Sequence, residues 1–166
     1  MSERDLSIRS VTTADLEAVV VLNTSEVQYT SPMDIGHLRS LDAISEYHKV
    51  VIVDGEVAGF LLVMSNGCDY INDNFEWFSS RYDSFLYIDR IVIGNDYQGL
   101  KLGTLLYKDL FTHARASGIP NITCEYNVVP PNEPSRLFHN RFSFSEVGTQ
   151  WLYNKTKKVS LQLAKV

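Results

Sequence analysis

The segment between residues 87 and 104 combines a strand-like run, a short loop with glycines and the start of an amphipathic pattern. Phe85 to Ile93 is strongly β-prone, and Leu102 to Ser117 has apolar residues at helical spacing. The first N–H groups of a helix lack intrahelical partners, and the helix dipole adds partial positive charge there. Gly99 and Gly103 would let an anion approach the backbone. The segment therefore predicts a site for a phosphate or diphosphate group.

Two other phosphate-binding patterns are missing from the sequence. It contains no Gly-x-x-x-x-Gly-Lys-Ser/Thr loop, and no Gly-x-Gly-x-x-Gly turn follows any of its predicted strands. Their absence argues against a P-loop nucleotide site and against a dinucleotide-binding fold.

The glycine-bearing segment resembles the acyl-CoA-binding motif of the GNAT-superfamily acetyltransferases, in which Gln/Arg-x-x-Gly-x-Gly/Ala follows a strand. Gln98 and Gly103 match at the same spacing, whereas Lys101 stands at the middle glycine position. If that position requires a positive φ, a lysine there costs about 1 kcal/mol. Its ammonium group could also lie near the phosphates.

A second segment, Asn132 to Phe144, resembles the fourth-helix pattern of the same superfamily, Asn-x-x-Ala-x-x-apolar-Tyr-x-x-x-Gly-Phe. Three residues match this pattern: Asn132, Phe138 and Phe144. Ser135 takes the small-residue position, His139 the tyrosine position and Ser143 the glycine position. Asn132 is also a predicted helix N-cap, and it shares one helix face with Ser135 and His139.

The resemblance implies acetyl transfer from acetyl-CoA to a primary amine by direct attack on the thioester. Backbone groups of Ile91 and Ile93 would pair with the pantetheine, and residues 98–104 would hold the diphosphate. The cofactor-binding residues implied by the two motifs are Ile91, Val92, Ile93, Gln98, Gly99, Leu100, Lys101, Leu102, Gly103, Thr104, Asn132, Ser135 and Phe138. No metal is expected.

His139 and Asp89 are the catalytic residues that the resemblance implies. In the family the residue at the His139 position protonates the departing thiolate, and a histidine is a stronger acid than a thiol. The alternative is a histidine with a purely structural hydrogen bond. Asp89 would deprotonate the incoming ammonium; the alternative is an ion pair with Arg90, and Glu125 is a rival base.

The acceptor amine is expected to contact Tyr29, Trp77 and Glu125. Trp77 lies in a polar and aromatic segment, Ser65 to Asp83, that shows no clean period and has the length of a binding loop. A solvated acidic loop anchored by buried aromatic residues is the alternative for this segment. The acceptor could be a small amine or a peptide N-terminus.

These residues require a mixed sheet to position them. We expect a single α/β (α+β) domain over residues 1–166, with six or seven mostly antiparallel strands and about four helices, as in the GNAT fold. Asp54-Gly55 predicts a tight hairpin between two apolar strands. Helices are predicted from Ala14 to Glu26, from Asp34 or Ile35 to Tyr47 and from Asn132 to Arg141. The strands Phe85–Ile93 and Ile122–Val128 should form a parallel pair that splays apart to admit the cofactor.

Composition narrows the remaining classes of function and location. The chain has 166 residues and a formal charge of −5, which does not favour nucleic acid, although a local basic patch is not excluded. No apolar run has the length of a membrane span, no secretory segment begins the chain, and Cys68 and Cys124 are far apart. A cytoplasmic protein is therefore expected, and its oligomeric state, a homodimer included, stays open. The alternatives to an acetyltransferase are a non-catalytic acyl-CoA-binding module and an unrelated phosphate-ligand enzyme.

Overall fold

The computed structural model describes residues 3–26 and 30–166, which form seven strands and five α-helices. They belong to two compact units: the first comprises residues up to Met64 and Ile88–Thr112, the second Ser65–Tyr87 and His113–Val166. Strand β4 (Leu86–Ile93) contributes its first two residues to the second unit and the rest to the first. The strand order is β1-β2-β3-β4-β5-β7-β6, a mixed and mostly antiparallel sheet. The predicted fold class is confirmed, with one helix more than expected.

The first unit begins with strand β1 (Leu6–Ser10) and helix α1 (Leu16–Ser25), joined by a single 3₁₀ turn. Thr12 donates to the Asp15 carboxylate from both its backbone N–H (2.7 Å) and its hydroxyl (3.0 Å), the contacts of a capping box. The Arg9 guanidinium, 2.6 Å away, lowers the pKa of Asp15 to about 2. This carboxylate therefore fixes the entry of α1 next to β1.

A tight hairpin connects strands β2 (Tyr47–Val53) and β3 (Glu56–Ser65). Asp54 and Gly55 both have positive φ, 49° and 84°, which is the backbone of a two-residue type I′ turn. The predicted end of the second helix at Tyr47 is wrong. Helix α2 (Ile35–Ile44) ends three residues earlier, because Tyr47 is already hydrogen-bonded in the sheet opposite Val63.

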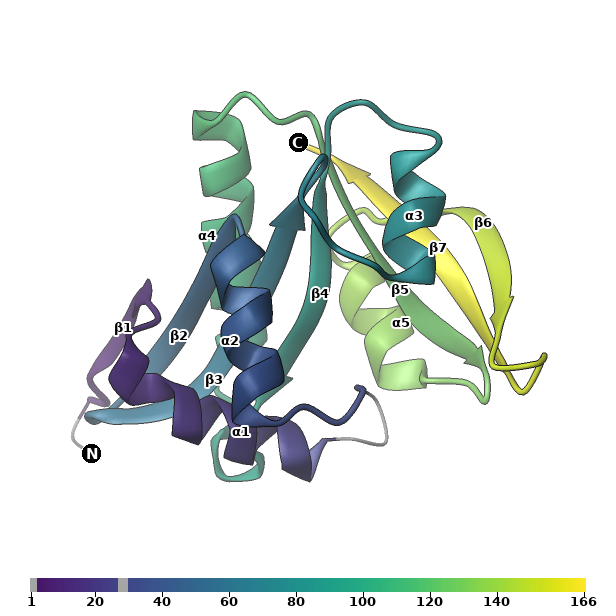
Figure 1. Ribbon diagram of the computed structural model, residues 1–166. Helices are drawn as coiled ribbons and strands as arrows, with labels where there is room; N and C mark the ends of the chain where they lie inside the picture. The colour runs from purple at the N-terminus through teal and green to yellow at the C-terminus, as the bar shows by residue number, and fades with distance from the viewer. Residues whose placement is uncertain (1–2, 27–29) are drawn as a thin grey trace. The chain divides into compact units, whose positions relative to one another are not determined.

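Successive residues of β2 show that helices cover both faces of the first unit. Tyr47 and Lys49 both donate to the Asp109 carboxylate on helix α4 (Leu102–Ala116), at 2.7 and 2.8 Å. His48, which points the opposite way, contacts Asp42 on α2 at 2.7 Å. Helices α2 and α4 therefore lie on opposite faces of β2, as Figure 1 also shows.

The second unit is built on strands β5 (Asn121–Val129), β6 (Ser145–Leu152) and β7 (Lys157–Lys165). Strand β7 runs antiparallel between the other two. The predicted parallel pair is confirmed by the register Leu86↔Ile122 and Tyr87↔Thr123 between β4 and β5. Helix α5 (Glu133–Asn140) follows β5 with Asn132 as its N-cap.

The segment Ser65 to Asp83, expected to have no regular structure, contains helix α3 (Asp73–Ser79). Its aromatic residues pack with Phe85 and Tyr87 rather than following a helical period, so the sequence pattern hides the helix. Asn72 caps α3 by accepting from the N–H groups of Asn74 and Phe75, both at 3.0 Å. The segment is thus a folded part of the second unit.

Candidate functional site

The predicted diphosphate segment lies entirely in the first unit, between β4 and α4. The Gln98 side chain donates to the Ile93 carbonyl at 2.9 Å and so closes the loop after β4. Gly99 has a φ of +84° and Lys101 a φ of +59°. Helix α4 begins at Leu102, whose side chain is buried, while Gly103 and Thr104 are partly exposed in its first turn. The segment therefore presents backbone at the start of a 15-residue helix.

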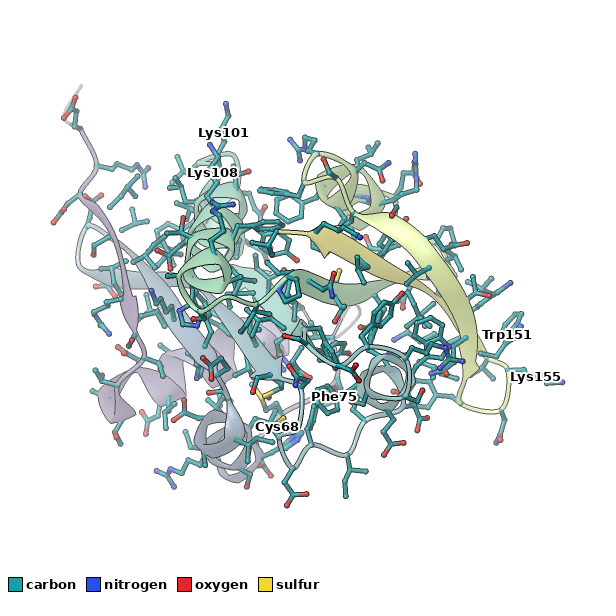
Figure 2. All side chains as sticks on the ribbon, turned by 90° about the horizontal axis from the view of Figure 1, so that it is seen from above. Cys68, Phe75, Lys101, Lys108, Trp151 and Lys155 are labelled. Carbon is teal, nitrogen blue, oxygen red and sulfur yellow. The ribbon has the colours of Figure 1, made fainter. Side chains whose placement is uncertain are left out.

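Lys101 occupies the left-handed conformation that the glycine of the family motif would adopt without strain. The side chain is exposed, and Figure 2 shows it projecting from the start of α4. The chain thus keeps the backbone of the motif although the glycine is missing. A lysine held at positive φ also places an ammonium group next to the first turn of the helix.

The second predicted segment lies in the second unit and shows the same pattern. Ser143 has a φ of +62° at the position where the family motif has glycine. The Phe144 N–H donates to the His139 carbonyl at 3.3 Å, which closes α5 on that left-handed residue. Asn132 accepts from the Ser135 N–H at 3.3 Å and caps the other end.

His139 is buried, with 4% of its surface exposed. Its Nδ1 lies 2.7 Å from the Ser135 carbonyl oxygen and 3.2 Å from the Ser135 hydroxyl. Because a carbonyl only accepts, Nδ1 carries the proton and Nε2 carries the lone pair when the ring is neutral. Burial lowers the pKa of His139, and the Ser135 carbonyl opposes that shift. The ring packs edge-on against Phe138 and Phe144.

Asp89 forms an ion pair with Arg90, the alternative to a catalytic role that the sequence leaves open. Arg90 Nε donates to its carboxylate at 2.6 Å, and the two side chains are only 4–5% exposed. The same guanidinium donates to Asn23 at 3.1 Å and to the carbonyl and hydroxyl of Ser31 at 3.0 and 3.1 Å. Arg90 therefore ties β4 to the end of α1 and to the chain that precedes α2.

Glu125 on β5 is partly exposed and is held by a tyrosine of β4. The Tyr87 hydroxyl lies 2.9 and 2.7 Å from the two Glu125 carboxylate oxygens. Tyr87 is fully buried among Tyr70, Phe75 and Phe78, so its hydroxyl has a fixed direction. Sequence reasoning missed Tyr87, because only the parallel register of β4 and β5 brings it to Glu125.

Trp77, expected to contact the acceptor, packs on the sheet of its own unit and is partly exposed. A Cβ on Gly148 of β6 would lie 2.4 Å from the indole, and the Arg81 guanidinium lies over the Trp77 ring at 3.9 Å from its centroid. Asn74 next to it accepts from Gln150 at 3.1 Å. Tyr29 lies outside the described residues. Phe75 and Phe78 are the buried aromatic anchors of this segment, and contact of Trp77 with the acceptor stays a prediction.

Within the described part of the chain, no cluster of His, Cys, Asp or Glu side chains could hold a metal ion. Among the same residues, no helix has both the length and the apolar character to cross a bilayer.

Comparison with known proteins agrees with the two motifs. The family model described as "Acetyltransferase (GNAT) family" matches residues 16–144, more than half of the chain. The chain belongs to the GNAT acetyltransferase family. The residues of this GNAT protein that match the family model include the two left-handed residues, Lys101 and Ser143. No curated protein has a significantly similar sequence.

Solved structures share the fold over nearly all of the chain. An Ard1 protein from Thermoplasma volcanium has a TM-score of 0.80 at 14% identity, with 97% of each chain covered. The acetyltransferase yncA from Salmonella typhimurium, solved with acetyl-CoA, has a TM-score of 0.72 at 16% identity, covering 97% of this chain and 94% of that one. Naa50 from Arabidopsis thaliana, solved with the bisubstrate analogue CoA-Ac-MVNAL, has a TM-score of 0.73 at 15% identity, covering 97% and 99%.

Proposed function

We propose that this GNAT protein transfers the acetyl group of acetyl-CoA to a primary amine. The observation that carries the proposal is the left-handed backbone at Lys101 and at Ser143, the two positions where the family motifs have glycine. Each non-glycine residue at positive φ costs free energy, so these conformations are maintained against the preference of the sequence. The backbone of both motifs is what a CoA-binding protein of this family needs.

The residues of the first unit suit a diphosphate. Gln98 closes the loop after β4, Gly99 takes a positive φ, and the exposed Lys101 precedes the N-terminus of α4. Together they offer backbone N–H groups, the positive end of a helix dipole and one cation. Acetyl-CoA would supply the thioester, and the resemblance of each segment to a family motif is what assigns the cofactor to it.

Glu125 is our choice for the group that removes a proton from the ammonium of the acceptor. It is partly exposed, whereas the Asp89 carboxylate is buried in its ion pair with Arg90. The Tyr87 hydroxyl orients the Glu125 carboxylate. The negative charge of this carboxylate would favour a cationic acceptor over a neutral one. A small amine and a peptide N-terminus both satisfy this requirement.

His139 stays a proposed proton donor to the thiolate. With Nδ1 committed to the Ser135 carbonyl, it must be protonated on Nε2 to act as an acid. The lowered pKa makes that form a stronger acid but a scarcer one at neutral pH. Turnover through His139 should therefore decrease as the pH rises above the pKa of the ring.

Calorimetric titration with acetyl-CoA tests the proposed cofactor. We expect a micromolar Kd, about −8 kcal/mol. Gly103→Glu should weaken binding by a hundredfold or more, roughly 3 kcal/mol, because it adds bulk and negative charge at the proposed diphosphate site. Thr112→Glu, a carboxylate on the last turns of the same helix, is the matched control and should leave Kd unchanged.

Unchanged affinity in Gly103→Glu would remove the diphosphate assignment. Steady-state turnover over a panel of amines then separates the enzyme from its alternative, a non-catalytic acyl-CoA-binding module. Binding without turnover for any amine would favour the module.

A further inference from the structure

The hairpin between β6 and β7, in the second unit, carries a charge opposite to that of the rest of the chain. Residues 147–166 contain four lysines and no acidic residue, whereas the 146 residues before them contain 11 basic and 20 acidic residues. Three of these lysines, Lys155, Lys157 and Lys158, lie at the closed end of the hairpin. A chain of net negative charge thus carries a local excess of positive charge at this hairpin.

Aromatic side chains lie between these lysines. Trp151 is 47% exposed and Tyr153 is 68% exposed. The Lys158 ammonium lies 5.5 Å from the Trp151 ring centroid, because the two residues are cross-strand partners, and the Lys157 ammonium lies 5.8 Å from the Tyr153 ring. Figure 2 shows Trp151 and Lys155 projecting from the same end of the hairpin. We name Trp151, Tyr153, Lys155, Lys157 and Lys158 the hairpin patch.

The turn of the hairpin is held in a conformation that Tyr153 and Lys155 disfavour. Tyr153, Asn154 and Lys155 have φ values of 52°, 55° and 66°, three left-handed residues in succession without a glycine. Glycine at these positions would relieve the strain but would remove the ring and the ammonium group. Retained strain together with exposed side chains points to a role for those side chains.

We infer that the hairpin patch binds single-stranded nucleic acid. Exposed aromatic rings stack on unpaired bases, and neighbouring lysines neutralise the phosphates, which is the combination that proteins use to bind single strands. An acidic polypeptide would use the lysines but not the two exposed rings, and a duplex offers no unstacked base to them. The acidic remainder of the chain confines the contact to the hairpin patch.

Fluorescence anisotropy of a labelled single-stranded 20-nucleotide oligo(dT) tests the inference on the full chain. With three lysines in contact, log K should fall with log salt with a slope of about −2, a loss of roughly fifteenfold between 50 and 200 mM salt. Lys155→Gln should reduce that slope by about 0.7. Lys165→Gln, an exposed lysine at the other end of β7, is the matched control and should change nothing.

Stacking is tested separately. Tyr153→Ala and Trp151→Ala should each weaken oligo(dT) binding roughly fivefold or more. Neither should alter binding to a duplex of the same length. Both side chains are exposed, and Tyr153 lies in the turn, so at least that variant keeps the sheet intact.

Three results would overturn the inference. The first is no binding of oligo(dT) at 50 mM salt, and the second is equal weakening by Lys165→Gln and Lys155→Gln. The third is binding of a labelled oligo-glutamate peptide or of anionic phosphatidylserine vesicles as tight as that of oligo(dT), with the same dependence on Lys155. That outcome would assign the hairpin patch to an acidic polypeptide or to a membrane surface.

Discussion

The two family segments of this protein, residues 98–104 in the first unit and 132–144 in the second, preserve their motifs in different ways. Both keep a left-handed residue without glycine, Lys101 in one and Ser143 in the other. In the first segment the Lys101 side chain is exposed, and the backbone conformation preserves the motif. In the second, a buried side chain, His139, contacts Ser135 of its own helix through Nδ1 and packs its ring on Phe144 and on Tyr126 of β5.

The difference indicates which part of each motif tolerates substitution. A diphosphate would be recognised by backbone N–H groups and a helix dipole, which every residue type except proline supplies. Lysine can therefore replace glycine at position 101 for the cost of local strain alone. Proton transfer needs an ionisable side chain, so position 139 would tolerate only residues such as histidine and tyrosine if it supplies the proton.

Removing His139 should have the largest effect. If it protonates the thiolate, His139→Ala should lower turnover at least tenfold while cofactor affinity changes little, since general acid catalysis typically contributes 10²- to 10⁴-fold. His139→Tyr should restore part of the loss. Turnover is measured where chemistry limits the rate, and circular dichroism must first show that each variant is folded, since a buried cavity could imitate a catalytic defect. A folded His139→Ala with full turnover would leave solvent as the proton source.

Glycine at the two left-handed positions should have a smaller effect of opposite sign. Lys101→Gly and Ser143→Gly should each raise the free energy of unfolding by up to about 1 kcal/mol, less the extra entropy of glycine in the unfolded chain. Urea denaturation measures both. A matched control is Lys108→Gly, in the helical interior of α4, which should destabilise by a similar amount. Destabilisation by Lys101→Gly would show that its side chain, and not only the backbone, supports the first segment.

The pH dependence of stability should be the smallest effect, and both units should contribute to it. Burial lowers the pKa of His48 and of His139, against the opposing contributions of Asp42 and of the Ser135 carbonyl. The unfolded chain takes up protons on these rings below about pH 6.5, while the folded chain does so only at lower pH. The unfolded state therefore holds more protons in that window, and the free energy of unfolding should decrease as the pH falls below 6.5.

Urea denaturation between pH 7.5 and 5 measures this decrease. His48→Asn keeps a donor toward Asp42 but does not titrate, so it should flatten the profile. The Asp15 carboxylate acts in a separate pH range. Because its pKa in the folded chain is lowered to about 2, its contribution to the free energy of unfolding is lost only below about pH 4. A His48→Asn profile as steep as that of the wild type would assign the loss to His139.

The local structure of this protein followed from the sequence wherever neighbouring residues decide it. Asp54-Gly55 determines a hairpin by its own conformational preferences, and Thr12 with Asp15 starts α1 by contacts over three residues. The apolar period of 102–117 and the Asn132 cap likewise predicted α4 and α5. Recognition of the two motifs predicted the family and the fold, because they keep their order and spacing although each lacks a glycine.

Contacts between distant segments decided what the sequence left open. Helix α3 is stabilised by packing its aromatic residues on Phe85, Tyr87 and Gly148, partners that no local period announces. The roles of Asp89 and Glu125 looked alike in the sequence, since each is a carboxylate on a β-strand. Their environments differ. Asp89 is buried in an ion pair with Arg90, whereas the parallel register of β4 and β5 brings the Tyr87 hydroxyl to Glu125. Spacing along a chain does not encode such pairings, which arise only when the strands pair in one register.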